Sequence, residues 1–183
     1  MSETATATLA PPVSRPRAMD VEALYRACAD DLYAYARTVV RDPILAEEVV
    51  AVAFERAVAR QRRFDARRGS PRAWIFGIAR NAAIDELRRT GRTAVLTHDP
   101  VDERHPDPAD QLAAADEAVR RRAAVADAIA ALPGRDRELV ALKFHAGLSN
   151  AEIAKVLGIS ATNAGSRLHR VLTRLREACH VGS

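Results

Sequence analysis

Residues 148–176, LSNAEIAKVLGISATNAGSRLHRVLTRLR, carry the strongest local signal in this sequence. Ser149 and Glu152 have the S-x-x-E spacing of a capping box, so we expect a helix to begin there. Gly158 favours a helix end because glycine readily adopts the left-handed backbone conformation, and Ser160 can cap a second helix after a short turn. The segment therefore predicts a helix-turn-helix, whose second helix can enter the major groove of DNA. The alternative is a plain pair of antiparallel helices with a basic, solvated face.

The predicted second helix carries short polar side chains near its N-terminus and arginines further along. Asparagine and arginine can form paired hydrogen bonds with adenine and guanine, whereas the later arginines are better placed for phosphates. Gly165 lies in this helix and lowers its propensity by about 1 kcal/mol relative to alanine. The candidate DNA contacts are Thr162, Asn163, Ser166, Arg167, Arg170 and Arg174.

The chain before residue 94 reads as helices separated by capping signals. Apolar residues recur at steps of three and four between residues 21 and 39, which predicts one buried helix face. Asp42-Pro43 and Ser70-Pro71 each combine an N-cap residue with a proline at the first helical position, where its missing N–H has no intrahelical partner. We therefore expect helices to begin near residues 21, 43 and 71.

The composition of the 183 residues favours helices. Hydrophobic residues make up 48% of the chain and aromatic residues only 4%, so alanine, leucine and valine must fill the core. No apolar run approaches the ~20 residues that span a bilayer, and no signal pattern opens the chain, so we expect a cytoplasmic protein without membrane insertion. Cys28 fits a small core residue, and Cys179-His180 lacks further ligands, so we expect no metal and no cofactor. Without a glycine-rich phosphate loop or a nucleophile motif, an enzyme has little support.

The net charge of +4 is distributed unevenly. Residues 1–93 carry +4, residues 94–115 carry −4 and residues 116–183 carry +4. Two basic regions thus flank an acidic, proline-bearing connector, which suggests a polyanionic partner, although a charged run can equally be a solvated face. Residues 1–18 mix Thr, Ala and Pro without periodicity and predict a disordered tail.

Aromatic and basic residues gather in the loop at 60–71 and the helix that follows it. Such a group can stack an unpaired base and hold its backbone. For Trp74 and Phe76, core packing is the competing interpretation, and for Phe64 both interpretations stay open. Trp74, Asn81 and Arg88 recur at steps of seven, so they share one helix stripe. The candidate contacts to an opened DNA strand are Phe64, Arg72, Trp74, Arg80, Asn81 and Arg88.

Three segments, in this order, resemble the extracytoplasmic-function (ECF) branch of bacterial RNA polymerase sigma factors. DPILAEEVVAVAFERAV (42–58) is similar to the helix of that family that binds core polymerase. WIFGIARNAAIDELRR (74–89) is similar to the helix that engages the −10 promoter element. ALPGRDRELVALKFHAGLSNAEIAKVLGIS (131–160), followed by SRLHRVLTRLR (166–176), is similar to the −35-binding domain.

The resemblance implies an all-α fold of two small helical domains: a four-helix N-terminal module and a C-terminal helix-turn-helix module, joined by a flexible acidic linker. The boundaries that we expect are a disordered tail at 1–18, a region 2-like domain at 19–93, a linker at 94–112 and a region 4-like domain at 113–180. The implied partners are core RNA polymerase and promoter DNA. The implied role is to direct polymerase to promoters and to aid strand opening, without catalysis.

The resemblance also assigns roles to residues. It places −10 bases against Asn81 and the preceding loop. Ala51 and Val52 stand where the family usually has polar residues, so we expect a more apolar contact with the polymerase clamp than is usual; the alternative is that Val52 is simply an isolated exposed residue. Asn163 to Gly165 stand where the family usually has a threonine, a branched aliphatic residue and a lysine, so the −35 bases that are read stay open. The candidate contacts to core polymerase are Glu47, Glu48, Val52 and Glu55.

Two other functions compete with this interpretation. One is a helix-turn-helix regulator that binds DNA without polymerase, and the other is an adaptor that binds polymerase or a regulator but no DNA. We also expect a separate anti-sigma protein to hold the two lobes together and inactive, because a flexible linker cannot lock them in one arrangement.

Overall fold

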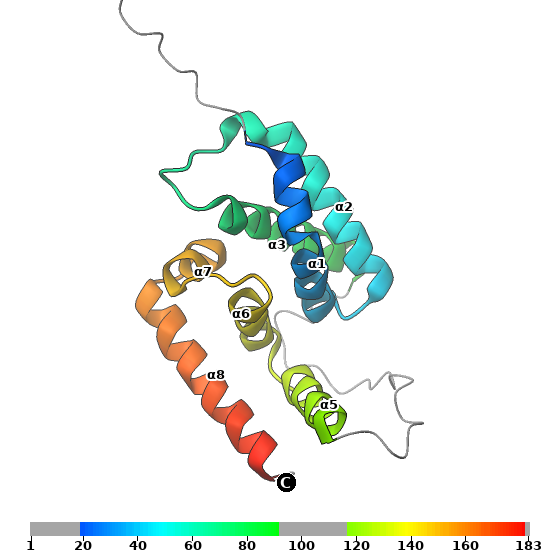
Figure 1. The fold of residues 1–183 in the computed structure, drawn as a ribbon, viewed down its shortest axis with the longest axis vertical. Coiled ribbons are helices and arrows are strands. Elements are labelled where there is room, and N and C mark those ends of the chain that lie inside the picture. The colour runs from blue at the N-terminus through cyan, green and yellow to red at the C-terminus, as the bar shows by residue number, and fades with distance from the viewer. Residues whose placement is uncertain (1–18, 92–116, 182–183) are drawn as a thin grey trace, which may run out of the picture.

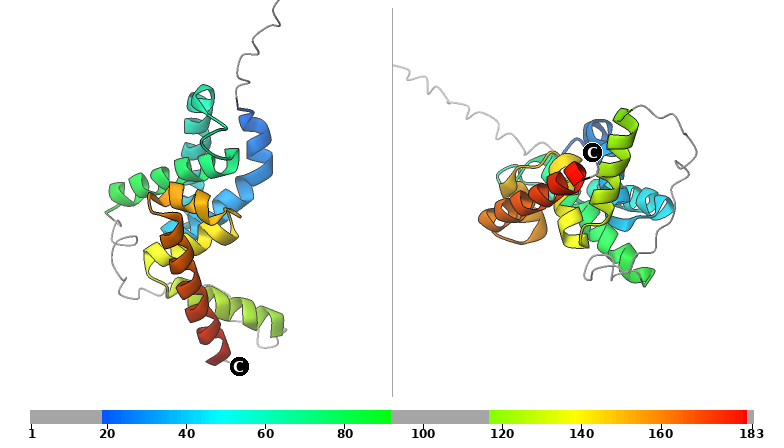
Figure 2. Two further views of the ribbon diagram at one scale, coloured as in Figure 1. Left: turned by 90° about the vertical axis from the view of Figure 1, so that its left-hand side faces the viewer. Right: turned by 90° about the horizontal axis from the view of Figure 1, so that it is seen from below.

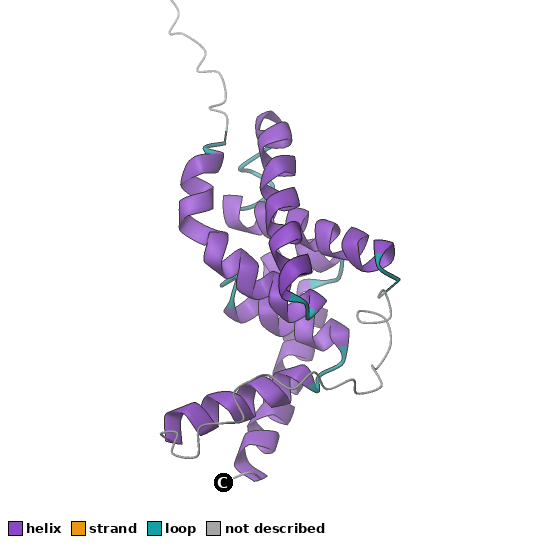
Figure 3. Cartoon of the chain, turned by 90° about the vertical axis from the view of Figure 1, so that its right-hand side faces the viewer, coloured by secondary structure: helices purple, strands orange, loops and turns teal. Residues whose placement is uncertain are grey.

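The computed structural model describes residues 19–91 and 117–181. Every regular element within these ranges is a helix, which confirms the all-α prediction (Figure 3). The predicted tail at 1–18 and linker at 94–112 lie outside the described residues. None of the described helices is both long and apolar enough to cross a membrane.

The helices form two lobes (Figure 1). We call residues 19–91 the N-terminal lobe; it consists of α1 (Val21–Val40), α2 (Pro43–Arg60), the short 3-10 helix η1 (Gln61–Arg63) and α3 (Pro71–Arg89). We call residues 117–181 the C-terminal lobe; it consists of α5 (Glu117–Ala130), α6 (Gly134–Phe144), α7 (Asn150–Leu157) and α8 (Ala161–Val181). The views in Figures 1 and 2 show α6 and α7 next to the N-terminal lobe and α5 and the end of α8 extending away from it.

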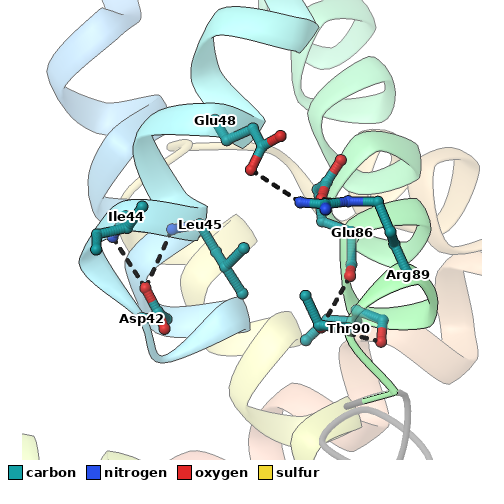
Figure 4. A network of polar contacts seen from close by, with 8 residues as sticks. Asp42, Ile44, Leu45, Glu48, Glu86, Arg89 and Thr90 are labelled. Atoms are coloured by element: carbon teal, nitrogen blue, oxygen red, sulfur yellow. Dashed lines mark hydrogen bonds and ion pairs between the residues drawn. The ribbon is translucent and has the colours of Figure 1, made fainter.

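Local capping interactions begin the helices of the N-terminal lobe where the sequence predicts. The Asp42 carboxylate accepts hydrogen bonds from the backbone N–H groups of Ile44 and Leu45, at 2.9 and 3.1 Å (Figure 4). The Ser70 hydroxyl accepts from Ala73 N at 3.1 Å. Each of these caps satisfies N–H groups that have no carbonyl partner in the first turn.

The predicted start and end of the first helix of the helix-turn-helix, and the predicted start of its second helix, are also confirmed. The Ser149 and Glu152 side chains form both halves of the capping box at the start of α7. Gly158 ends that helix with φ of 69°, in the left-handed region where glycine carries no steric penalty. Ser160 Oγ then accepts from Asn163 N at 3.1 Å and caps α8.

The two lobes share one hydrophobic core. α1, α2 and α3 bury the predicted apolar face of α1, including Cys28, against one another. The same cluster of buried side chains continues into the C-terminal lobe through Leu139, Leu142, Leu148 and Ile153. α6 lies against α1, and α7 lies against α3. The lobes therefore pack directly on each other, whereas the sequence led us to expect that a separate protein holds them together.

Candidate nucleic-acid interface

α8 presents its polar residues on the outside of the helix-turn-helix. Ile153 and Ala154 of α7 are buried against Ala164 and Leu168 of α8, so the opposite face of α8 is turned to solvent. A side chain at Gly165 would bring a Cβ atom to 3.3 Å from the Asn150 amide, so this glycine allows a close approach of α8 to α7. The exposed candidates on the outer face are Thr162, Asn163, Ser166, Arg170 and Arg174.

Arg167 differs from these neighbours because its side chain is half-buried and paired. Its Nη2 atom lies 2.7 Å from Asp136 Oδ1, which belongs to the first turn of α6. Arg174 Nη1 lies 3.7 Å from the other oxygen of the same carboxylate, but Arg174 is exposed, so that contact contributes little. The predicted base-reading arginine is thus turned toward its own lobe.

A pocket of about 510 Å³ opens beside the start of α3. The rings of Phe64 and Trp74 meet edge to face in its wall, with centroids 5.5 Å apart. Asn81 is exposed and also lines it, so three of the predicted strand contacts come together here. Both rings are half-buried, whereas Phe76 is fully buried in the core. Lys155 and Val156 of α7 close one side of the pocket.

Two other residues that were predicted to contact an opened DNA strand, Arg72 and Arg80, instead bind groups of the other lobe. Arg72 binds the Asp31 carboxylate of α1 and donates to the backbone carbonyls of His145 and Ala146, with 3.0 Å to His145 O. Arg80 Nε lies 2.9 Å from Glu138 Oε1 of α6. Arg88, near the end of α3, is exposed. The six predicted contacts therefore do not form one continuous exposed group.

The Glu138 carboxylate is buried at the centre of the contact between the lobes. Only 3% of this residue is exposed, and Tyr35 of α1 donates its hydroxyl to Oε1 at 3.3 Å. Burial raises the pKa of Glu138, and the positive charge of Arg80 partly offsets that rise. Burial, followed by the charge of Glu138, also raises the pKa of the Tyr35 phenol.

Arg137 is the other charged residue that the fold buries, with 2% exposed. Its Nε donates to Thr38 O in the last turn of α1 at 3.1 Å. Its Nη1 donates to Ala130 O and Leu132 O at the end of α5, at 3.2 and 3.0 Å. Burial, with a smaller contribution from Arg41, lowers the pKa of Arg137 to about 10. One guanidinium therefore satisfies carbonyls at the C-terminal ends of two helices, one in each lobe.

Neither Arg137 nor Glu138 was among the residues singled out from the sequence. Both lie in the first turns of a charged helix, DRELVALKF (136–144), which has the composition of a solvated helix face. Nothing in the local spacing distinguishes a buried charge from an exposed one, since its partners come from α1, α3 and α5.

The predicted polymerase contacts lie on α2. Glu47, Glu48 and Glu55 are exposed, but Val52 is half-buried and packs against the core. The exposed apolar area at Val52 is therefore smaller than we expected, because α2 turns part of this side chain toward the other helices. Glu48 Oε2 accepts from Arg89 at 3.1 Å, and Arg89 also pairs with Glu86 at 2.7 Å (Figure 4).

Comparisons with known proteins agree on one family. The family model for Sigma-70 region 2 matches residues 24–93, and the model for Sigma-70, region 4 matches residues 122–175. The ECF RNA polymerase sigma factor SigL of Mycobacterium tuberculosis is 33% identical over 157 residues, which are 85% of this chain and 86% of SigL. The ECF RNA polymerase sigma factor RpoE of Cereibacter sphaeroides is 35% identical over 134 residues, 72% of this chain and 68% of RpoE.

A solved structure is also similar over most of the chain. It is the sigma factor RpoE of Bartonella quintana in complex with the anti-sigma factor NepR, with a TM-score of 0.65 and 25% identity. The match covers 90% of this chain and 99% of RpoE. With its two matched regions, its helix-turn-helix and its helical lobes, this chain belongs to the ECF RNA polymerase sigma factors, the transcription factors that direct RNA polymerase to promoters.

Proposed function

We propose that this sigma factor reads the −35 element with the N-terminal part of α8. The observation that carries this proposal is the solvent-exposed row of Thr162, Asn163 and Ser166 on a helix that α7 supports from behind. Residues near the N-terminus of a recognition helix meet base edges, so these side chains read the sequence, and Arg167 can join them only after it leaves Asp136. Arg170 and Arg174 lie further along and hold phosphates.

The pocket beside α3 is the proposed site for an unstacked base of the −10 element. Phe64 and Trp74 supply aromatic surface for stacking, and Asn81 supplies donors and acceptors for a base edge. Arg72, Arg80 and Arg88 supply positive charge for the DNA backbone on the same helix. Arg72 and Arg80 become available for this role once their contacts with the C-terminal lobe are released.

The exposed acids of α2 are the proposed contact with core polymerase. Glu47, Glu48 and Glu55 offer negative charge on one helix, and the half-buried Val52 adds a small apolar area between them. Electrostatic complementarity of this kind accelerates encounter and selects the partner more than it adds affinity.

The proposed domain boundaries are 19–93 for the −10 and polymerase-binding unit, 94–112 for the linker and 113–180 for the −35-binding unit. The protein acts in the cytoplasm with polymerase and performs no catalysis itself. An anti-sigma protein is a proposed partner, supported by the similar RpoE structure, which contains the anti-sigma factor NepR.

Run-off transcription with core polymerase tests the proposal. We expect transcripts from specific promoters with core polymerase and this protein together, and weak duplex binding by the protein alone. Asn81→Ala should leave polymerase binding intact and reduce permanganate reactivity of the −10 region, whereas Asp85→Ala, an exposed residue one turn later, should not. Wild-type reactivity in Asn81→Ala would remove the assigned role of Asn81.

A further inference from the structure

We propose that the pocket beside α3 also binds a free purine nucleoside 5′-diphosphate or triphosphate. Aromatic surface, a hydrogen-bonding amide and cations line the same volume, and such a ligand requires all three. Nucleotide binding itself does not depend on the proposed function. Its consequence, competition with an unstacked −10 base for the same pocket, rests on that function.

The volume and the aromatic wall of the pocket suit a nucleotide. Its volume of about 510 Å³ lies within the range of roughly 300–1,000 Å³ that small-molecule sites in proteins occupy. The ring planes of Phe64 and Trp74 are 62° apart, so a flat ligand that stacks on one ring meets the edge of the other. The indole of Trp74 offers the larger surface, which favours a two-ring purine over a pyrimidine.

One face of α3 leaves room for the base. Trp74, Gly77, Ile78 and Asn81 recur at steps of three and four along the helix, and all of them line the pocket. A Cβ atom added at Gly77 would meet no atom within 4 Å, so this glycine leaves open space. The exposed amide of Asn81 lies one turn further along, where it can pair with a purine edge as asparagine does with adenine.

The cations of the pocket come from separate elements. Arg63 is the last residue of η1, Arg68 lies in the loop before α3, and Lys155 belongs to α7. Asp65 is the one acid among the described residues that line the pocket, so positive charge predominates there. Arg63 and Arg68 are exposed, and neither forms an ion pair with another described residue. Their guanidinium groups are therefore available to a phosphate.

This charge distribution fits a free nucleotide better than one unit of a DNA strand. An unstacked base in a strand brings its own phosphate, and the next phosphates lie on the adjacent nucleotides. A nucleoside 5′-diphosphate instead concentrates several negative charges at one end. Lys155 Nζ donates to Arg68 O at 3.1 Å, which holds this ammonium beside the loop (Figure 1). An ammonium has three donors, so two remain for charge-assisted hydrogen bonds with phosphate oxygens.

Trp74 provides a direct test because it is the only tryptophan in the chain. A base that stacks on its ring quenches its fluorescence, so titration of the full chain with ADP or GDP, without DNA or polymerase, measures binding at this pocket. We expect saturable quenching by both nucleotides, roughly tenfold weaker binding of adenosine, and weaker binding of ADP at high salt. Absence of saturable quenching would overturn the proposal. Tripolyphosphate that binds as tightly as ADP would also overturn it, because the base would then contribute nothing.

Two double variants of the same loop locate the phosphates. Arg63→Gln with Arg68→Gln removes two cations from the pocket and should weaken ADP binding by roughly tenfold to a hundredfold. Arg62→Gln with Arg67→Gln removes the same charge at exposed residues outside the pocket lining, and should weaken binding by less than about threefold. Equal weakening by the two double variants would show a diffuse electrostatic attraction to the loop instead of a site.

A substitution at Gly77 tests the volume of the pocket. Gly77→Leu places a side chain in the open space, and leucine has the higher helix propensity, so the fold should be retained. Binding of ADP should weaken by roughly tenfold or more, whereas Gly77→Ala, which adds a single methyl group, should have a smaller effect. Urea unfolding of both variants verifies the fold. Unchanged quenching by ADP in a folded Gly77→Leu variant would place the nucleotide elsewhere and overturn the proposal.

Permanganate footprinting of the holoenzyme on a promoter, without substrates for transcription, tests the competition. ADP should reduce the reactivity of the −10 region, because the nucleotide and the unstacked base occupy the same pocket. Unchanged reactivity at a saturating concentration of ADP would overturn the competition. If the holoenzyme without ADP shows no reactivity, the proposed function fails, while the quenching measured on the free chain decides nucleotide binding independently.

Discussion

The candidate −35 residues and the candidate −10 residues lie in opposite environments. On α8, the side chains of Thr162, Asn163 and Ser166 are exposed while the lobes are in contact. On α3, Arg72 and Arg80 are engaged by the other lobe. While the lobes are in contact, the candidate −35 residues of α8 are therefore exposed, whereas two of the candidate −10 residues of α3 are bound by the other lobe.

The largest expected effect comes from weakening the buried contact between the lobes. Arg137→Met removes the donor to three carbonyls that belong to the ends of α1 and α5, and leaves them buried without it. We expect a loss of about 3–5 kcal/mol in the free energy of unfolding, because each buried carbonyl left without its donor costs about 1–3 kcal/mol. Urea unfolding of the full chain measures it. The control is Arg135→Met, an exposed arginine on the same helix, which should change stability by less than about 0.5 kcal/mol.

The next prediction compares two arginines of α8 in their effect on −35 recognition. Arg167→Ala should reduce discrimination among −35 sequences by about 1–3 kcal/mol, because a base-reading arginine carries that much preference. Arg174→Ala should instead weaken binding evenly across sequences and lower its salt dependence, as expected for a phosphate contact. Transcription by holoenzyme from a set of −35 variants compares the two. Equal, sequence-independent losses would show that Arg167 stays with Asp136 and reads no base.

A smaller effect concerns the close approach of α8 to α7. Gly165→Ala should stabilise the C-terminal lobe by up to about 1 kcal/mol, because alanine has the higher helix propensity. The new methyl group would meet the Asn150 side chain at 3.3 Å, and this exposed amide can rotate away. Thermal unfolding measures the change, with Asn150→Ala as a companion variant that removes the neighbour. A destabilised Gly165→Ala that Asn150→Ala restores would mean that the amide cannot move.

The smallest expected effect is a pH dependence of stability that arises from His145, at the contact between the lobes. Burial lowers the pKa of His145, and the negative charge of Asp31 partly opposes this. A histidine with a lowered pKa stabilises the fold above its ordinary pKa of about 6.5, and this contribution is lost as the pH falls through the lowered value. Glu138 acts in the opposite direction because its pKa is raised. The free energy of unfolding of His145→Gln should therefore fall less than that of wild type between about pH 7 and pH 5. Urea unfolding at several pH values measures this, and an equal fall in both proteins would contradict the prediction.

The sequence predicted the position of the candidate site residues where the signal is local, and missed their packing partners where it is not. The position of α8 and its outward residues could be read from the capping box and the glycine stop. Phe64, Trp74 and Asn81 were also named together, because they lie close in the chain and meet in one pocket. Arg72 and Arg80 were predicted to contact an opened DNA strand, and their partners in the other lobe could not be recognised from spacing. Val52 was expected to make the polymerase contact more apolar, although the packing of α2 half-buries it.

The local sequence is sufficient to fix the starts of α2, α3 and α7. Asp42, Ser70 and Ser149 bond backbone groups two or three residues away, so residues adjacent in the chain carry all the information needed. Only the tertiary structure decided that Arg137 and Glu138 are buried and that the lobes close on each other. Tyr35 and Glu138 are 103 positions apart in the chain, and such a contact depends on how whole helices pack. Hydrophobic burial is non-directional, so the apolar pattern requires a buried face without specifying which surface covers it.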